Sequence, residues 1–417
     1  MASLAPPQLH KSTKAKNTTP RSKAASFISD GFLFAAAVLV AFLLVWALSS
    51  FFAATPSFST SSFPDKPAAC LDCVTGPDPL NDPPDKNFYD DPELSYTIDS
   101  PPVKSWDEMR REWLKQHPSF SGERILMVTG SQSTPCRNPI GDYLLLKLFK
   151  NKVDYGRRHG IDVFYNNVLF QPKMVSFWAK TPTLKAAMLA HPEAEWIWWI
   201  DSDAAFTDMD FELPLGRYKG HNMVIHGWPN LIYEKKSWTS INAGVFLIRN
   251  SQWAMDFMDV WARMGPQHDD YDKWGEILRS TFKDKLYPES DDQSGLAYLL
   301  LKEKEKWGDK IYVENEYYFQ GYWVEIVGTF ENITEKVWAE QLKDAGGGRG
   351  RPLITHFTGC QPCSGDHNQM YSGQTCYDAM QKALTFADNQ VLRNYGFVHP
   401  DLQDPSTVNP LPFDYPA

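Results

Sequence analysis

The stretch EWIWWIDSDAAFTDMD, residues 195–210, joins an apolar run to two closely spaced carboxylates. Residues 197–200 are Ile, Trp, Trp and Ile, and they lead directly into Asp201-Ser202-Asp203. An uninterrupted apolar run is typical of a strand that is buried on both faces of a sheet. Such a strand holds the residues at its tip rigidly, at the edge where open α/β sheets bind their ligands. The stretch therefore predicts an α/β fold whose functional site includes the two carboxylates.

The segments around this strand alternate between strand and helix patterns. Before it lie a strand at 124–130, a helix that ends at Gly160, a strand at 161–167 and a helix at 178–192. Such alternation predicts a parallel sheet with crossover helices. The later part is expected to add strands at 222–227, 241–250 and 352–357, and helices near 251–264 and after residue 293. We expect one folded domain over residues 118–417.

The first 117 residues have the composition of a membrane anchor and a tether. Residues 1–29 carry five Lys and Arg and no acidic residue, whereas residues 31–54 contain no charge. A helix of that length spans roughly 36 Å, enough to cross a hydrocarbon core of about 30 Å. We expect a cytoplasmic tail at 1–30, a transmembrane signal anchor at 31–54 and a Pro/Ser-rich lumenal stem at 55–117, closed by a short helix. A cleaved signal peptide is the alternative.

Net charge and cysteine content restrict the partners and the compartment. The net charge of −10 argues against nucleic acid as a partner. Six cysteines on the lumenal side of the predicted anchor are expected to be mostly oxidised. Two C-x-x-C pairs, at 70–73 and 360–363, invite a zinc interpretation, but their separation in sequence favours disulfides, whose pairing is left open. The sequon at Asn332 is expected to face the lumen, where it can be glycosylated.

A D-x-D motif by itself is weak support for a metal site, because Asp is also common in turns and at helix N-termini. The chain has two further examples, at 208–210 and 270–272, with no apolar strand before them. We expect those to lie in turns or on solvated faces. Asp201 and Asp203, in contrast, follow a predicted strand, where two carboxylates can share a divalent cation with phosphate oxygens.

Three later motifs place polar side chains at the ends of predicted elements. They are Asn242 with Gly244, the group Asp291-Asp292-Gln293 before a helix, and His356 followed by Gly359. Each taken alone has an ordinary structural explanation, such as a helix N-cap, a turn or a buried histidine. Their combination with the D-x-D motif, in this order, favours a shared functional site.

Over about residues 122–400 the chain resembles the plant cell-wall glycosyltransferases of family 34. The likeness is carried by TGS, CRNPIGDYLLLK, WIWWIDSDA, SWTSINAGVFLIRN, DDQSGLAYLL, THFTGCQPC and FADNQVLRNYGF. The spread and order of these blocks make the match specific. It implies a GT-A fold, which is one Rossmann-like, nucleotide-binding α/β domain, in agreement with the strand and helix pattern.

The resemblance implies a role for each of the motif residues. Asp201, Asp203 and His356 would bind a metal ion, and their mixed oxygen and nitrogen ligands suit Mn²⁺ better than Mg²⁺. The ion would neutralise charge that builds up on the UDP leaving group. Thr129, Gly130, Ser202 and Gly359 would line the nucleotide, and Asn242, Gly244, Asp291, Asp292 and Gln293 would surround the donor sugar.

The family retains the anomeric configuration of the transferred sugar. Retention requires a covalent intermediate or a front-face attack through an oxocarbenium-like state. Asp291, Asp292 and Gln293 are the expected catalytic residues, with Asp292 and Gln293 near the β-face of the sugar. Because a carboxamide is a poor nucleophile, we favour front-face attack, in which a UDP phosphate oxygen takes the acceptor proton.

Finer features of the resemblance predict the donor and the acceptor. After the dipeptide GC, xylosyl members carry a lysine that pairs with the diphosphate, whereas this chain has Gln361. Lys180 or Lys185 is expected to compensate for the missing charge. NAGVFLIRN, WGEILRSTFKDKLYPESDDQ, GCQPCSG and the C-terminal PLPFDYPA look more like the galactomannan branch. We therefore expect UDP-galactose as donor, β-1,4-mannan as acceptor and an α-1,6 branch as product.

Two other functions stay open. The chain could be a xylosyltransferase that uses UDP-xylose and β-1,4-glucan, or a non-catalytic, polysaccharide-binding partner of a synthase complex. The intact metal-binding motif argues against the second. We further expect a single-pass type II protein of the Golgi membrane, in a complex with a mannan synthase or a second copy of itself. Candidate platforms for stacking on the acceptor are Trp228, Trp238, Tyr318 and Trp323.

Overall fold

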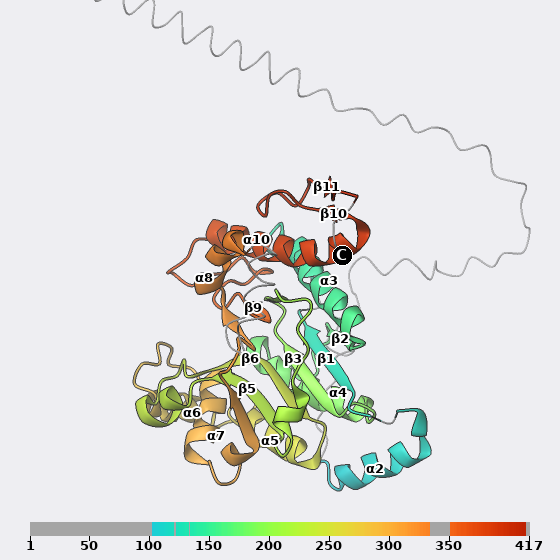
Figure 1. Ribbon diagram of the computed structural model, residues 1–417. Helices are drawn as coiled ribbons and strands as arrows, with labels where there is room; N and C mark the ends of the chain where they lie inside the picture. Colours follow the sequence, from blue (N-terminus) through green and yellow to red (C-terminus); the bar gives the residue numbers. More distant parts are fainter. Residues whose placement is uncertain (1–101, 121, 133, 334–350, 414–417) are drawn as a thin grey trace, which may run out of the picture. The chain divides into compact units, whose positions relative to one another are not determined.

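The structure, a computed structural model, describes residues 102–413 except 121, 133 and 334–350, and the described residues belong to one compact unit (Figure 1). No helix within this part of the chain is long and apolar enough to cross a membrane. The predicted tail, the predicted anchor at 31–54 and most of the predicted stem lie outside the described residues. The same holds for Thr334 of the sequon.

The centre of the fold is a six-stranded mixed sheet in the order β2-β1-β3-β6-β5-β7 (Figure 1). β2, β1 and β3 are parallel, as predicted, but β6 runs antiparallel to both β3 and β5, and β7 is parallel to β5. The strands are β1 (Ile125–Gly130), β2 (Asp162–Asn166), β3 (Trp196–Ile200), β5 (Met223–Gly227), β6 (Ile241–Arg249) and β7 (Ile311–Glu314). β5 and β7 therefore run in the same direction as β1, β2 and β3, and the prediction of a parallel sheet is wrong for β6 alone.

Both faces of β3 are buried, as its apolar run predicts. Trp196, Trp198 and Ile200 belong to the core cluster on one face, and Ile197 and Trp199 to the cluster on the other. Helices α4 (Lys180–Ala190), α5 (Gln252–Ala262) and α7 (Asp292–Lys302) supply the cluster around Trp199, with α6 (Tyr271–Thr281) beside them. α3 (Gly141–His159) and α10 (Gly373–Leu392) contribute to the opposite cluster. The tip of β3 is therefore fixed by packing on two sides.

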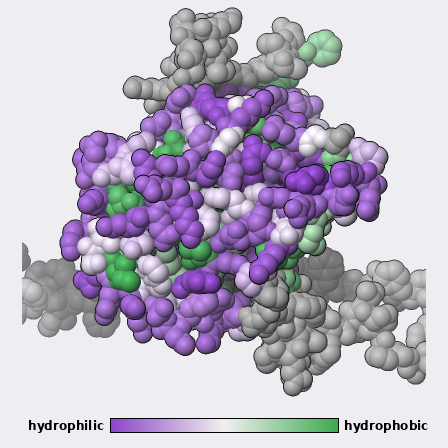
Figure 2. Space-filling model, turned by 90° about the horizontal axis from the view of Figure 1, so that it is seen from below, coloured by the Kyte–Doolittle hydropathy of each residue, from purple (hydrophilic) through white to green (hydrophobic). Residues whose placement is uncertain are grey.

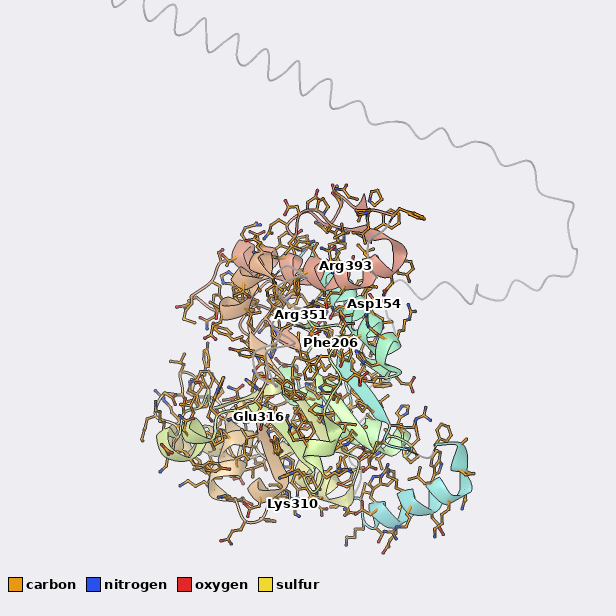
Figure 3. All side chains as sticks on the ribbon, in the orientation of Figure 1. Asp154, Phe206, Lys310, Glu316, Arg351 and Arg393 are labelled. Atoms are coloured by element: carbon orange, nitrogen blue, oxygen red, sulfur yellow. A yellow bond between two sulfur atoms is a disulfide. The ribbon has the colours of Figure 1, made fainter. Side chains whose placement is uncertain are left out.

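A second, three-stranded sheet continues the chain beyond the tip of β3. Its order is β4 (Ala204–Phe206), β9 (Ile354–His356) and β8 (Gly321–Tyr322). β4 is antiparallel to β9, which places His356 opposite Ala204. Phe206 of β4 stacks on Tyr155 of α3 with ring centroids 3.7 Å apart, and Figure 3 shows it between the six-stranded sheet and α10. The remaining short elements are α8 (Trp323–Ile326), β10 (Phe397–Val398) and β11 (Asn409–Pro410).

Side chains of α3 form hydrogen bonds with backbone groups of β4. The amide group of Asn151 accepts from the backbone N–H of Phe206 at 2.7 Å and donates to its carbonyl at 2.9 Å. Nζ of Lys152 donates to the carbonyl of Ala204 at 2.6 Å. A buried backbone group without a partner is costly, so these polar residues stabilise the strand that follows the D-x-D motif.

The short helix predicted at the end of the stem is present as α2 (Trp106–Gln116), and it packs against the domain. The indole N–H of Trp106, which is 5% exposed, donates to Oδ1 of Asn250 at 2.7 Å. The guanidinium of Arg110 lies 2.8 Å from the carboxylate of Glu195. The folded unit therefore includes the last part of the predicted stem, and it begins before residue 118.

Four of the six cysteines form disulfides, Cys136–Cys363 and Cys360–Cys376. The two cysteines of the C-x-x-C motif at 360–363 thus pair with different partners, and this motif is not a zinc site. Cys70 and Cys73 lie outside the described residues. The face of the molecule shown in Figure 2 is mostly hydrophilic, with hydrophobic residues in small separate patches.

Candidate active site

The two carboxylates at the tip of β3 converge with His356. Nε2 of His356 lies 3.2 Å from Oδ1 of Asp203 and 3.8 Å from Oδ2 of Asp201. The pairing of β4 with β9 brings the imidazole there, because His356 sits opposite Ala204 in the register. The indole N–H of Trp199 donates to Oδ1 of Asp201 at 2.6 Å and fixes its orientation. One potential ligand atom from each of the three residues lies within 4.8 Å of the others.

This arrangement fits a divalent metal ion. Among the described residues it is the one cluster of three His, Cys, Asp or Glu side chains with such spacing. Two carboxylates and an imidazole are a common donor set for first-row divalent metals. Gly244 leaves room beside the cluster, since a Cβ at this position would lie 2.6 Å from Oδ2 of Asp201 and closer still to the imidazole of His356. The residues present therefore match the metal site that the sequence predicts.

The antiparallel direction of β6 brings its first residues to the tip of β3. The backbone N–H of Asp201 donates to the carbonyl of Gly244 at 2.8 Å. Oδ1 of Asn242 accepts from the backbone N–H of Gly244 at 2.8 Å, so the amide of Asn242 holds the local turn of the strand. Had β6 been parallel to β3, these residues would lie at the opposite edge of the sheet.

Substituting Gly244 by Ala is expected to impair the metal site without unfolding the chain. The added methyl group must displace the imidazole of His356 or the carboxylate of Asp201. Disturbance of the groups that orient metal ligands typically lowers metal affinity about 10- to 100-fold. Isothermal titration of Mn²⁺ into the full-length chain measures the change, and Gly216→Ala, where a Cβ meets nothing within 4 Å, is the matched control. Equal Mn²⁺ affinity of the two variants would contradict the placement of Gly244.

A buried lysine connects the acidic tip to the N-terminus of α7. Nζ of Lys180 lies 2.6 Å from Oδ2 of Asp292 and 3.4 Å from Oδ1 of Asp201, and it donates to the carbonyl of Ala243 at 2.8 Å. Burial lowers the pKa of Lys180, but the two carboxylates outweigh this effect and raise its pKa above the ordinary value. Burial raises the pKa of Asp292 to about 6, against the opposing effect of Lys180. The amine of Lys180 is therefore charged and forms ion pairs with Asp292 and Asp201.

A second buried lysine, Lys152 of α3, contacts the backbone of the D-x-D motif. Its Nζ donates to the carbonyls of Ser202 and Ala204, at 3.3 and 2.6 Å. Burial lowers the pKa of Lys152 to about 7, although Asp203 and Asp201 act in the opposite direction. Sequence reasoning missed this residue, because a lysine in an amphipathic helix is usually solvated. Its spacing of four residues from buried Leu148 was the available signal.

The cluster opens into a cavity of about 720 Å³. This volume is in the range of sites for small-molecule ligands and cofactors. Most of the predicted site residues line it: Gly130, Asp201, Ser202, Asp203, Asn242, Gly244, Asp292, Gln293, His356 and Gly359. Residues from β1, β3, β6, β9 and α7, distant in sequence, therefore meet at one site.

Thr129 and Asp291 are predicted site residues that do not line this cavity. Thr129 is fully buried inside β1, one position before the rim. Asp291 is the N-cap of α7, where its Oδ1 accepts from the backbone N–H of Ser294 at 2.7 Å. Its Oδ2 accepts from the hydroxyl of Ser294 at 2.8 Å and lies 2.5 Å from Nζ of Lys285. Asp291 thus stabilises the helix start that presents Asp292 and Gln293.

The predicted compensating lysines and aromatic platforms fall into different environments. Lys180 lines the cavity, whereas Lys185 pairs with Asp259 at 2.8 Å and does not line it. Trp323 is 4% exposed and packs on Phe357, so it is a core residue rather than an exposed platform. Trp228 and Tyr318 are 41% and 42% exposed, and Trp238 is half-buried, with its carbonyl accepting from Nε2 of Gln293 at 3.1 Å.

Residues 121–367 match the galactosyl transferase GMA12/MNN10 family. The chain belongs to this family, glycosyltransferase family 34. It is 56% identical over 428 residues to "Glycosyltransferase 6" of Arabidopsis thaliana, covering 95% of this chain and 98% of the relative. It is 53% identical over 434 residues to "Galactomannan galactosyltransferase 1" of Cyamopsis tetragonoloba, covering 95% and 98%. Identity to "Xyloglucan 6-xylosyltransferase 1" of Arabidopsis thaliana is 48% over 310 residues, covering 72% and 65%.

Family membership confirms the resemblance that the sequence blocks indicate. The region that matches the family, 121–367, contains the metal cluster and every predicted site residue. As a member of family 34 the chain is a glycosyltransferase, and its acidic cluster is compatible with a divalent metal.

Proposed function

We propose that this glycosyltransferase moves galactose from UDP-galactose to a β-1,4-mannan chain and forms α-1,6 branches. The observation that carries the proposal is the meeting of Asp201, Asp203 and His356 with the Lys180–Asp292 pair in one cavity large enough for a nucleotide sugar. The choice of galactose rests on the 53% identity to a galactomannan galactosyltransferase over nearly the whole chain. The xylosyltransferase relative matches over 72% of this chain.

Mn²⁺ is the metal that the ligand set favours. An imidazole nitrogen beside two carboxylates suits Mn²⁺ better than Mg²⁺, which prefers oxygen ligands and retains its waters. When bound, the ion would supply positive charge to the diphosphate leaving group. Asp201, Asp203 and His356 would hold it, and the indole of Trp199 keeps Asp201 in orientation. A GT-A mode of donor binding, with the nucleotide along the β1 and β3 tips, accords with this placement.

The surroundings of the two aspartates at the start of α7 favour front-face attack. Asp291 does not line the cavity, and its oxygens are occupied by Ser294 and Lys285, so it is poorly placed to act as a nucleophile. Asp292 lines the cavity, but one of its oxygens is held by Lys180 at 2.6 Å. Lys180 would therefore orient Asp292 toward the donor sugar, and Gln293 beside it would bind a sugar hydroxyl. A glycosyl adduct on Asp292, trapped and seen by mass spectrometry, would contradict this mechanism.

Product analysis tests the proposed donor, acceptor and linkage together. The full-length chain is incubated with Mn²⁺, a mannan or a glucan oligomer, and either UDP-galactose or UDP-xylose. We expect transfer with UDP-galactose and mannan oligomers, and linkage analysis is expected to show α-1,6-galactose. Transfer of xylose to the glucan oligomer would instead identify the second candidate. A chain that transfers neither sugar but binds the oligomers would support a non-catalytic role in a synthase complex.

The membrane placement is a separate proposal that rests on composition. The basic residues 1–29 and the uncharged residues 31–54 favour a type II anchor with the catalytic domain in the Golgi lumen. In that compartment a polysaccharide synthase or a second copy of the chain could bind it. Protease protection in sealed Golgi vesicles tests the orientation, since digestion of the catalytic domain from outside the vesicles would contradict it.

A further inference from the structure

A bound nucleotide diphosphate needs positive charge in addition to a metal ion, because the walls of the cavity are acidic. Asp201, Asp203 and Asp292 all line it. Among the described residues, the Lys and Arg side chains that line the cavity are Lys180 and Arg137. Lys180 is 2% exposed and is held by two carboxylates and a carbonyl. Its charge is already balanced within the protein, which leaves Arg137.

The backbone of Arg137 is anchored on both sides to the loop that follows β9. Cys136 forms a disulfide with Cys363, and the backbone N–H of Asn138 donates to the carbonyl of Cys363 at 2.9 Å. Nδ2 of Asn138 donates to the carbonyl of Pro362 at 2.8 Å. Arg137, Pro362 and Cys363 all line the cavity. These bonds hold the start of the Arg137 side chain at the rim.

The guanidinium group of Arg137, in contrast, is only weakly held. It lies 3.5 Å from Oδ2 of Asp366, and the two side chains are 80% and 70% exposed. An ion pair of this length between exposed groups contributes little to stability, so the guanidinium can exchange Asp366 for another anion at small cost. Its planar fork of donors matches phosphate oxygens better than the amine of a lysine does.

We infer that Arg137 binds the diphosphate of the nucleotide-sugar donor and is the positively charged side chain that Lys180 cannot provide. This inference rests on the proposed function of the cavity. Gln361 lies on the loop that is joined to Arg137 through the disulfide, and it lines the same cavity. The amide of Gln361 is neutral, so the loop after β9 offers no positive charge to a phosphate. The charge at the rim is supplied instead by Arg137, on the loop after β1.

Titration of UDP into the full-length chain with Mn²⁺ present tests the assignment. Removal of one charge-assisted hydrogen-bonding group is expected to weaken UDP binding about tenfold in Arg137→Ala. Arg137→Lys is expected to recover part of the loss, and the double variant Arg137→Ala/Gln361→Lys to recover part of it by placing the charge on the other loop. Arg279→Ala, which removes an exposed arginine of α6 that does not line the cavity, is the matched control.

Affinity for Mn²⁺ alone and the thermal unfolding midpoint are expected to be unchanged in all four variants. UDP binding by Arg137→Ala within twofold of wild type would overturn the inference. Equally weak binding by Arg137→Lys and Arg137→Ala would also overturn it, because the charge would then not be responsible. A wild-type chain that binds no UDP in the presence of Mn²⁺ would instead overturn the proposed function, and this inference with it.

Discussion

Substitution of Asp203 by Asn is expected to reduce sugar transfer at least about 100-fold, because a metal ligand is replaced by a neutral group of the same shape. The carboxylate of Asp203 lies 3.2 Å from Nε2 of His356, in the cluster that fits a divalent cation. An amide in its place binds such a cation far more weakly. Initial rates over a series of Mn²⁺ concentrations measure the effect, and excess Mn²⁺ is expected to restore only part of the activity.

The chain provides its own control for this substitution. Asp272 belongs to another D-x-D motif, but it lies exposed in the first turn of α6. Asp272→Asn is therefore expected to transfer sugar at the wild-type rate. Both variants are expected to unfold within a few degrees of wild type, because Asp203 is partly exposed. Full activity in Asp203→Asn would remove this carboxylate from the metal site.

Substitution of Lys180 by Met is expected to cost both stability and activity. The change removes a buried charge that lies 2.6 Å from Asp292 and 3.4 Å from Asp201, and it leaves the carboxylate of Asp292 buried and unpaired. Loss of one partner from a buried pair costs about 3–5 kcal/mol. Thermal unfolding and initial rates, both on the full-length chain, measure the two effects.

Two further variants separate packing from charge. Lys185→Met removes an amine from the same helix, but its pair with Asp259 is partly exposed, and we expect a loss of about 1 kcal/mol or less. Lys180→Met/Asp292→Asn removes both charges of the buried pair, and we expect it to recover stability without recovering activity. A Lys180→Met chain as stable and active as Lys185→Met would contradict the structural account of the site.

The sequence was sufficient to predict five of the six central strands and the residues at their tips, but not β7 (Ile311–Glu314) or the short β4 (Ala204–Phe206). The alternation of Trp196, Trp198 and Ile200 with Ile197 and Trp199 between two core clusters follows from one apolar run. The direction of β6 did not follow, because an apolar run reads the same for a parallel and an antiparallel strand. The connection between β5 and β6, residues 228–240, is long enough for either direction. The direction of β6 is therefore set by its packing in the folded domain and not by the local sequence.

The site residues that lie at the ends of strands were predictable from the sequence. The residues whose role depends on being buried were less predictable. Asp201, Asp203 and His356 meet as predicted from the resemblance. The buried hydrogen bond of Lys152 and the ion pair of Lys180 with Asp292 were not predictable. A bond to a carbonyl or carboxylate that is distant in sequence leaves no local sequence pattern. Asp291 was expected to be a catalytic residue, and the structure shows it as the N-cap of α7, in contact with Ser294 and Lys285.

The central claim is that Asp201, Asp203 and His356 together hold a divalent cation beside the nucleotide. Anomalous diffraction from crystals of the protein soaked with Mn²⁺ and UDP tests it most directly. We predict an anomalous peak for a manganese ion that is coordinated by both carboxylates and by Nε2 of His356, with the diphosphate as a further ligand. A bound UDP with no manganese peak at these three side chains, or with the imidazole of His356 turned away from the peak, would contradict the claim.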